Sequence, residues 1–387
     1  MGIWPNLTRR YVGASGGATN CTGCVDSFLP VERTFVVAGG RFREPYYWDS
    51  FWIVEGLLRT QGSFTQIALN IIENFLDFVE EFGFVPNGAR VYYLNRSQPP
   101  LLTQMVRVYV EYTNDTSILA RALPILEKEY DFWINNQTVD VQKNGQTYTL
   151  NQYTVENNQP RPESYREDYV QANNASFYAA SGEVYNEPRP LTDEEKAQLY
   201  QNLASGAESG WDYSSRWLAN PADAVNGDYF PLRSLNVVKI VPVDLNSILY
   251  YNEVCIAQFH ALLGDSSAES QWNDRAATRK TAMTAVLWDE ELYSYFDYNM
   301  TSNALDRYII ADADANATET AGAPAGYQVA FSPAQFYPFW TGAVPDVLMQ
   351  PAAVRRAYAR ISDMLDRKAG AIPATNLVTG QQWDEPN

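Results

Sequence analysis

The sequence predicts an all-α fold in which inner and outer helices alternate, an α/α toroid. Apolar residues recur at three- and four-residue steps between Ile67 and Phe82, which is the period of an amphipathic helix. Several further segments have helical spacing, and irregular segments that carry polar motifs lie between them. The sequence contains no internal repeat of fixed period, which disfavours the alternative architecture, a helical-repeat binding scaffold.

The expected elements follow one another along the chain. Residues 1–36 lack a clear period and are expected to form an N-terminal covering segment, followed by a toroid domain over 37–387. Thr192 and the acids after it form a helix start, with a capping hydroxyl and early negative charge. Short β-like pieces surround Tyr148, and 288–298 reads as a turn or hairpin. Besides the helix between Ile67 and Phe82, the predicted helices are one starting at Ser50, 101–112, 117–135 with Pro124 near a first turn, one from Thr192 to just before Glu208, one starting at Asp244, 268–287, 331–341 and 346–368.

The composition limits the kinds of ligand. The formal net charge of −18 argues against nucleic acid or an anionic membrane surface as a partner. The 26 tyrosines and ten tryptophans favour a cleft that faces carbohydrate. No run of eighteen apolar residues is present, so the sequence predicts no membrane span. A neutral ligand fits these features.

The residues available for catalysis are mostly carboxylates. His260 is the only histidine and lies in a helical, mostly apolar stretch, so a multi-histidine zinc site or a Ser-His-Asp triad is disfavoured. Cys21 and Cys24 form one C-x-x-C without the second pair of a Cys₄ site, and are expected either to form a disulfide or to be free. Cys255 reads as a core residue. We expect acid/base chemistry by carboxylates, with no metal and no cofactor.

One stretch concentrates groups that suit a sugar. Between Gly39 and Asp49 lie two glycines, two arginines, two acids and four aromatic residues. The glycines allow a tight turn, the charged side chains supply hydrogen bonds, and the aromatic faces suit a sugar ring. The alternative is an Arg–Glu network that fixes a loop.

These residues also resemble a known family. GGRFREPYYWDS, at 39–50, is similar to the first signature of the trehalases, glycoside hydrolases that cut α,α-trehalose into two glucoses. The resemblance implies an (α/α)6 toroid of the six-hairpin glycosidase kind, an inverting mechanism, and trehalose as the ligand. Four further segments match family blocks in family order, and a fifth resembles the start of the second signature: 86–90, 95–100, 161–165, 208–217 and 382–387.

The resemblance implies a general acid and a set of sugar contacts. The acid is Asp212, whose neighbours Trp211, Tyr213 and Trp217 could raise the pKa of its carboxyl group. The alternative for Asp212 is a helix cap before Tyr213. The implied substrate-binding residues are Arg41, Trp48, Asp49, Asn87, Arg96, Ser97, Gln98, Arg161, Pro162, Glu163 and Gly210.

The sequence departs from the family pattern in places. Ala38 stands where the family has proline, and Phe51 where it has tyrosine. The second signature normally continues with Gly-Trp, and the family's general base is a Glu expected beyond the end of this chain. We therefore expect the interior of a trehalase, with a toroid incomplete at its C-terminal end and little activity as given. The alternatives are a non-catalytic sugar-binding relative and a hydrolase of another α-glucoside.

Asn-x-Ser/Thr acceptors are numerous and favour an extracellular, vacuolar or secretory glycoprotein. The start of the chain lacks a basic region and an apolar segment typical of a signal peptide. The sequence makes no prediction of the oligomeric state. The acceptors are Asn6, Asn20, Asn95, Asn114, Asn136, Asn174, Asn299 and Asn316.

Overall fold

The structure, a computed structural model, describes residues 2–13, 25–178, 181–220, 231–311, 315–367 and 372–384. Its packing divides the chain into two compact units. Unit 1 comprises Met1–Asn136 and Tyr251–Ala276, and unit 2 comprises Gln137–Tyr250 and Ala277–Asn387. In the part of the chain that the structure describes, helices predominate and the strands are short. The predicted boundary between residues 36 and 37 stays a prediction.

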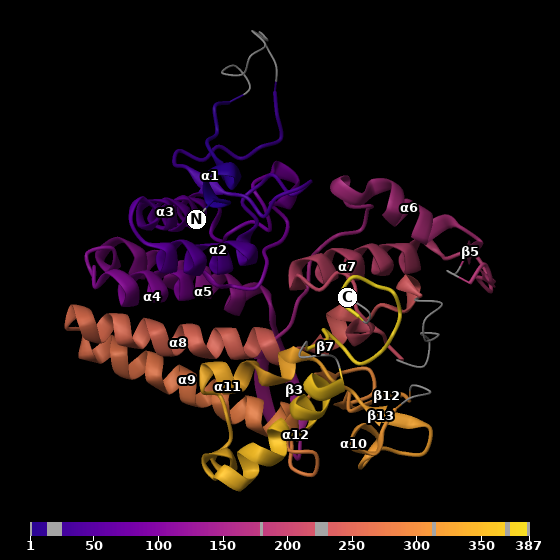
Figure 1. The fold of residues 1–387 in the computed structure, drawn as a ribbon. Coiled ribbons are helices and arrows are strands. Elements are labelled where there is room, and N and C mark those ends of the chain that lie inside the picture. The colour runs from indigo at the N-terminus through magenta and orange to yellow at the C-terminus, as the bar shows by residue number, and fades with distance from the viewer. Residues whose placement is uncertain are drawn as a thin grey trace. The chain divides into compact units, whose positions relative to one another are not determined.

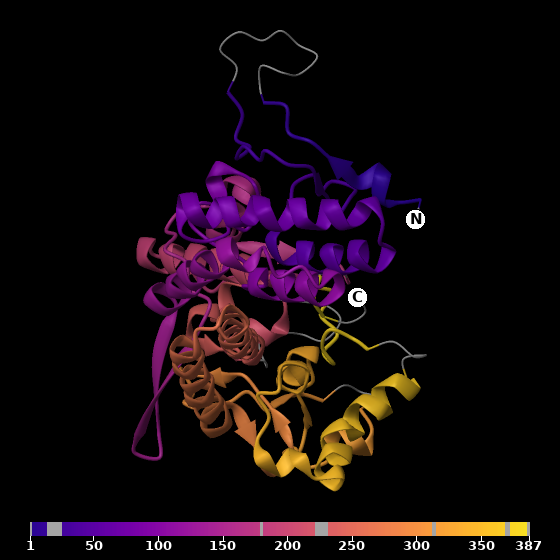
Figure 2. The same ribbon diagram turned by 90° about the vertical axis from the view of Figure 1, so that its left-hand side faces the viewer.

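Unit 1 is built on four helices that lie side by side (Figures 1 and 2). The apolar period in the sequence is the buried face of the second of them, where Ile72, Leu76 and Val79 are fully buried. That helix ends at Gly83, whose φ of 87° lets its N–H reach the carbonyl oxygen of Val79. The four helices are α2 (Tyr47–Thr60), α3 (Ser63–Phe82), α4 (Leu102–Thr113) and α5 (Leu119–Asn136).

Smaller elements of unit 1 precede and follow this group. The helix α1 (Trp4–Leu7) leads into β1 (Thr8–Arg9), which pairs antiparallel with β2 (Phe35–Val36). The only histidine of the sequence lies in the second segment of unit 1, and its Nε2 is 2.9 Å from the Glu127 carboxylate. Cys255 is buried, as predicted. Cys21 and Cys24 lie outside the described residues.

Unit 2 contains the later helices and most of the strands. Its helix α7 starts with a complete capping box, because Thr192 accepts the N–H of Glu195 and the Glu195 carboxylate accepts the N–H of Thr192. The predicted helix start is therefore confirmed. The helices with residues in this unit are α6 (Tyr165–Asn173), α7 (Asp193–Ser209), α8 (Val243–Leu263), α9 (Ser266–Leu287), α10 (Ala317–Thr320), α11 (Tyr337–Thr341) and α12 (Pro351–Arg367), with α8 and α9 shared with unit 1.

The β-like pieces predicted around Tyr148 form one hairpin (Figure 2). Asn144 and Gly145 connect its strands with φ values of 53° and 76°, which suits a two-residue hairpin turn. Val141 and Leu150 of the hairpin belong to the core of unit 2, where they join Met283 of α9. The paired strands of unit 2 are β3 (Thr138–Lys143) with β4 (Gln146–Asn151), β5 (Ser176–Tyr178) with β6 (Val184–Asn186), β8 (Trp288–Asp289) with β9 (Ser294–Tyr295), β12 (Tyr308–Ile310) with β13 (Tyr327–Val329), and β10 (Tyr298–Asn299) between β7 (Ile240–Val241) and β11 (Ala304–Leu305).

Some predicted helix bounds are wrong. The segment 331–341 is not one helix, because a 3₁₀ turn at Pro333–Phe336 precedes the short α11. Proline lacks the N–H that a continuous helix needs, and two prolines lie in this segment. Likewise, a 3₁₀ turn at Asp346–Met349 precedes α12. Pro124 lies inside α5, five residues after its start, and α7 continues to Ser209.

A helix that spans a membrane needs about twenty predominantly apolar residues. Within the described residues, no helix has both the length and the apolar composition that a membrane-spanning helix needs.

Candidate active site

The glycines of the first motif make the tight turn that their sequence predicts. Gly39 and Gly40 have φ values of 113° and 58°, and Gly39 and Phe42 exchange both backbone hydrogen bonds, at 3.1 and 2.9 Å. Arg41 is exposed beside this turn, with its guanidinium carbon 5.0 Å from the Phe42 ring centroid. Glu44 is buried and forms an ion pair of 3.0 Å with Arg90. Glu44 thus ties the first motif to the second, which contains Arg90, and Arg41 of the first motif is accessible to a ligand.

The start of α2 holds the next two predicted residues. Trp48 and Asp49 lie in its first turn, and the N–H of Trp48 donates to the Gln98 side chain at 3.1 Å. Burial raises the pKa of Asp49, although a hydrogen bond from its own backbone N–H acts in the opposite direction. A half-buried carboxylate of this kind is suited to accept hydrogen bonds from a sugar hydroxyl.

Tyr47, which precedes these residues, is fixed from three sides. Its N–H donates to the carbonyl oxygen of Asn87 at 3.1 Å, and its hydroxyl accepts the N–H of Leu102 at 2.8 Å. The same hydroxyl is hydrogen-bonded to the buried Glu129 of α5. Burial raises the pKa of Glu129 to about 8, despite that hydrogen bond, so its carboxyl group is mostly protonated at neutral pH. The helix start that carries Trp48 and Asp49 is therefore anchored to the unit 1 core.

The second and third motifs fold onto each other. Asn87 donates from its backbone N–H to the carbonyl oxygen of Arg96 at 3.0 Å, and from its side chain to that of Ser97, also at 3.0 Å. The Ser97 hydroxyl donates to the carbonyl oxygen of Val85 at 2.7 Å. Asn87, Arg96, Ser97 and Gln98 are all buried, at 5%, 1%, 0% and 7% exposure. These contacts give Asn87 and Ser97 a part in holding the loop, whichever sugar contacts they also make.

Gly88 of the second motif lies against two tyrosine rings, which leave little room for a side chain. A Cβ atom at Gly88 would lie 3.0 Å from the Tyr93 ring and 3.1 Å from the Tyr46 ring. Such distances are shorter than almost all real Cβ contacts, so the two tyrosine rings would have to shift by a few tenths of an ångström to admit a side chain. The glycine therefore permits the close approach of Tyr46 in the first motif, and of Tyr93, to the second motif.

In unit 2, Arg161 is buried and held by a partner that the sequence did not identify. The Asp168 carboxylate of α6 accepts from Arg161 Nε at 2.9 Å and from Nη2 at 2.7 Å, and a third bond comes from the Arg161 backbone N–H. Burial acts to lower the pKa of Arg161, but Tyr213, Asp168 and Glu163 outweigh it and raise that pKa. Pro162 and Glu163 are exposed in the 3₁₀ turn that follows.

Gly210 and Asp212 lie directly after α7. Gly210 ends this helix in the left-handed conformation, with φ 75°. Asp212 is half-buried, and the next residue, Tyr213, donates from its hydroxyl to the carbonyl oxygen of Leu203 at 2.9 Å. A Cβ atom at Gly206 would lie 2.7 Å from the Tyr213 ring, so only glycine leaves room for it. The guanidinium carbon of Arg161 lies 5.7 Å from the same ring, so this predicted binding residue is near the residue that follows the predicted acid.

Asp212 does not cap a helix. The short 3₁₀ turn after it spans Ser215–Trp217, and Ser214 is its cap, with its hydroxyl accepting the N–H of Arg216 at 3.1 Å. The alternative reading of Asp212 is therefore wrong, because the turn begins only at Ser215 and its cap is Ser214.

Arg216 joins the Asp212 segment to a buried ionic network. Its guanidinium is paired with Asp244 at 2.8 Å and with Asp297 at 2.5 Å. The guanidinium carbon also lies 5.0 Å from the Trp211 ring centroid and 4.4 Å from that of Trp217. These contacts give Arg216 and Trp217 a part in holding the fold around the Asp212 segment.

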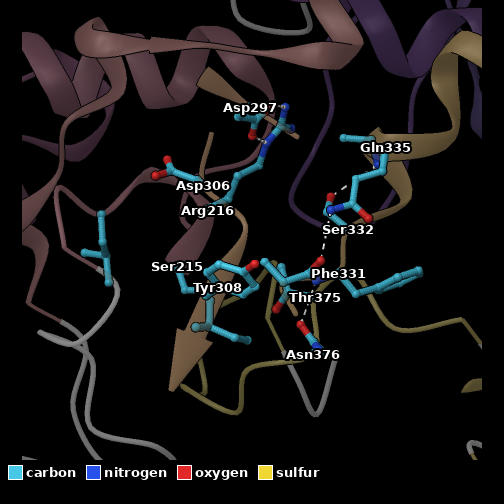
Figure 3. Close-up of a pocket in the computed structure, with 14 residues that line it drawn as sticks. Ser215, Arg216, Asp297, Asp306, Tyr308, Phe331, Ser332, Gln335, Thr375 and Asn376 are labelled. Atoms are coloured by element: carbon cyan, nitrogen blue, oxygen red, sulfur yellow. Dashed lines mark hydrogen bonds and ion pairs between the residues drawn. The ribbon is translucent and has the colours of Figure 1, made fainter. Parts of the chain in front are cut away.

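A small cavity of about 50 Å³ lies beside this network (Figure 3). Asp297 contacts the Arg216 guanidinium there, and Asp306 lies on the same wall. Burial and the nearby Asp297 charge raise the pKa of Asp306 to about 7, while a hydrogen bond from Asn299 lowers it. The remaining lining residues include Ser215, Tyr308, Phe331, Ser332, Gln335, Thr375 and Asn376.

Asp306 is expected to make stability depend on pH. A carboxyl whose pKa is about 7 when folded and about 3.9 when unfolded favours the folded state fully below pH 4, and this contribution is lost between about pH 4 and 7. Asp306→Asn removes the titration, so the variant should gain stability relative to the parent as the pH rises, by at most about 4 kcal/mol. Urea unfolding of both proteins at pH 4.5 and 7.5 measures this gain. An equal difference at the two pH values would contradict it.

The two units thus hold different parts of the predicted set. Within unit 1, Trp48 and Gln98 are in contact, as are Asn87, Arg96 and Ser97. Within unit 2, Arg161 lies near the residue that follows Asp212. Sequence reasoning did not identify Tyr47, Glu129 or Asp168 as supports, since no local pattern marks partners so distant or so irregularly spaced. The residues in unit 1 are Arg41, Trp48, Asp49, Asn87, Arg96, Ser97 and Gln98, and those in unit 2 are Arg161, Pro162, Glu163, Gly210 and Asp212.

Comparisons with known proteins agree with the motifs. The sequence model of the trehalase family matches residues 2–387. The chain is 38% identical over 392 residues to the trehalase of Dictyostelium discoideum, covering 100% of this chain and 57% of that protein. It is 37% identical over 361 residues to human trehalase, covering 93% of this chain and 54% of the human protein.

A solved structure shows the same fold. Neutral trehalase Nth1 from Saccharomyces cerevisiae superimposes with a TM-score of 0.63 and 23% sequence identity, covering 92% of this chain and 60% of that one. This similarity, with the predominance of helices, confirms the predicted fold class, the α/α toroid.

The family match extends over nearly the whole of this chain, although the chain is shorter than its relatives. The chain spans 51% to 61% of the length of four curated relatives that it matches. The family model nevertheless covers almost every residue of this chain, and all of the motifs that suggested the family lie within the match. The chain belongs to the trehalase family.

Proposed function

We propose that the protein hydrolyses α,α-trehalose to two glucose molecules. The observation that carries this proposal is the family match over residues 2–387, together with relatives named trehalase at 32% to 38% identity. The geometry supports it, because a half-buried carboxyl group, Asp212, lies in a segment that also brings a buried arginine and an aromatic ring close by. A carboxyl group can protonate a glycosidic oxygen, and an arginine can donate hydrogen bonds to sugar hydroxyl groups.

The proposed mechanism is inversion by two carboxyl groups. Asp212 donates a proton to the glycosidic oxygen, and a second carboxylate activates a water molecule on the opposite face of the sugar ring. In such enzymes the two carboxyl groups are about 6.5–9.5 Å apart, which leaves room for the water. The position of this second carboxylate, the general base, beyond these 387 residues stays a prediction from the family pattern. Trehalose is proposed to bind to Arg41, Trp48, Asp49, Asn87, Arg96, Ser97, Gln98, Arg161, Pro162, Glu163 and Gly210.

A substrate panel tests the activity. The purified protein in its natural full length is incubated with trehalose, maltose and kojibiose, and released glucose is measured. We expect release from trehalose and little from the other two. Release mainly from maltose or kojibiose would instead identify a related α-glucosidase. Binding of trehalose without release would identify a non-catalytic sugar-binding relative.

An extracellular or secretory location is proposed from two observations. One relative, 32% identical, is named a periplasmic trehalase of Escherichia coli. Five of the predicted glycan acceptors are exposed, which would allow modification. Asn299 is an exception, because it is only 1% exposed and its side chain accepts the N–H of Thr301. The exposed acceptors are Asn6, Asn95, Asn114, Asn136 and Asn174.

A further inference from the structure

The segment that carries Asp212 is held by two adjacent residues far along the chain, Trp383 and Asp384. The Trp383 ring stacks on that of Trp211, with centroids 5.1 Å apart and planes 25° apart. The backbone N–H of Trp383 also donates to the carbonyl oxygen of Tyr213 at 3.3 Å. The residues immediately before and after Asp212 are therefore both in contact with Trp383.

Asp384 holds the next two residues of the segment. Its carboxylate is fully buried, with 0% exposure. Oδ1 accepts from the Ser214 hydroxyl at 2.8 Å and from the Ser215 hydroxyl at 3.0 Å. The Ser215 backbone N–H donates to both oxygens, at 3.1 and 2.8 Å. The carboxylate thus accepts one backbone N–H and two hydroxyl groups at the point where the 3₁₀ turn Ser215–Trp217 begins.

The same carboxylate is fixed from its other side. The Thr375 hydroxyl donates to Oδ1 at 2.9 Å, and the Thr379 hydroxyl donates to Oδ2 at 2.6 Å. An ionised carboxylate only accepts hydrogen bonds, so five neutral donors can converge on it without competing for a proton. Hydrogen bonds to a charged acceptor are stronger than those between neutral groups, and burial strengthens them further. Asp384 is therefore a rigid point of attachment.

Rigidity at this point has a consequence for Asp212. A proton donor works only when it is held in the reactive geometry, and a misplacement of about 1 Å can cost about 10²-fold in rate. Asp212 lies in a segment without regular secondary structure between the end of α7 and the 3₁₀ turn Ser215–Trp217, so the direction of its side chain depends on how residues 211 to 215 are held. Trp383 and Asp384 contact Trp211, Tyr213, Ser214 and Ser215, and so restrain the backbone on both sides of Asp212.

We propose that Trp383 and Asp384 are positioning residues that orient the Asp212 carboxyl group toward the glycosidic oxygen. The inference rests on the proposed function, since it assumes that Asp212 is the general acid. Under this proposal, Asp384 affects the rate of the chemical step and not the affinity for the sugar. Its carboxylate is engaged by hydroxyl and N–H groups of its own unit and has no exposed surface for a ligand.

Asp384→Asn in the full-length protein tests this role. An amide in place of the carboxylate puts an NH₂ group next to the Ser215 N–H in either orientation, because that N–H contacts both oxygens. We expect kcat for trehalose to fall by about 10²-fold with little change in KM. α-Glucosyl fluoride is the second substrate, because its leaving group is a weak base and gains little from protonation. The kcat of the variant for this substrate should fall much less.

The matched control is Asp289→Asn, another buried aspartate of unit 2. Its carboxylate accepts the N–H groups of Glu291 and Leu292 at 3.0 and 2.7 Å, in the turn between β8 and β9. This variant should lose thermal stability and keep the ratio of the two activities. Thr379→Val removes a single donor to Asp384 and should lower the trehalose activity by a smaller factor. This variant tests the same role if Asp384→Asn does not fold.

The outcomes separate the inference from the proposed function. If the parent protein releases no glucose from trehalose, the proposed function fails. If the parent is active, an Asp384→Asn variant that keeps its kcat overturns the inference alone. Equal losses on trehalose and on α-glucosyl fluoride also overturn it, because a merely structural defect affects both substrates alike. If Asp384→Asn does not fold, unchanged trehalose activity in a folded Thr379→Val variant has the same meaning.

Discussion

Replacement of Asp212 by asparagine is expected to lower kcat for trehalose by about 10²–10⁴-fold. The amide has the shape of the carboxyl group but cannot give a proton to the departing oxygen. The Asp212 side chain is half-buried, and an asparagine fits the same space, while residues 211 and 213–215 keep their contacts with Trp383 and Asp384. The fold and the affinity for trehalose should therefore survive the substitution. Steady-state kinetics and calorimetric titration with trehalose measure the two effects separately.

A second variant, Asp289→Asn, shows whether the loss of kcat is specific to Asp212. Asp289→Asn changes a buried aspartate of the same unit that does not contact the Asp212 segment in any described hydrogen bond. It should retain kcat. Activity of Asp212→Asn within a few-fold of the parent would remove Asp212 from the role of general acid, and trehalose hydrolysis would then require a different proton donor.

The second large effect is expected from Asp168→Ala. This change leaves the buried Arg161 guanidinium without the carboxylate that accepts two of its N–H groups. Removal of one partner of a buried ion pair typically costs about 3–5 kcal/mol, since the remaining charge is uncompensated. We expect a loss of stability of that order and a higher KM for trehalose, measured by urea unfolding and by kinetics.

A double variant separates the two contributions. Arg161→Leu with Asp168→Leu removes both charges and should recover much of the lost stability, because an apolar pair of similar volume needs no partner. It should not recover trehalose binding if Arg161 contacts the sugar. Recovery of both stability and a normal KM would show that Arg161 only supports the fold.

Local signals in the sequence were sufficient for much of the fold. The period from Ile67 to Phe82 and the capping residues from Thr192 to Glu195 are contained within single segments, and both elements form as predicted. The prediction of one helix over 331–341 is wrong because the apolar residues of this segment suit a helix, whereas its prolines interrupt the hydrogen bonding. Short paired strands such as β10 with β7 were not predicted, since their partners are more than fifty residues apart.

The candidate site also combines features that a single segment predicts with contacts between residues far apart in the sequence. Motifs identified the candidate residues, but not the contacts that hold them. Asp384 reaches Ser214 across 170 positions, and Glu129 reaches Tyr47 across 82. Nothing in one segment indicates which distant carboxylate it will bind, because that choice depends on the packing of whole helices. The structure was needed to find these supports.

The central claim, inverting hydrolysis of trehalose, is tested most directly by the anomers that are first released. Proton NMR of the full-length protein acting on trehalose distinguishes α- from β-glucose before mutarotation mixes them. Direct attack of water on one sugar inverts that centre, whereas the other glucose leaves with its configuration unchanged. The account predicts equal amounts of α- and β-glucose at early times. Early release of α-glucose alone would contradict it.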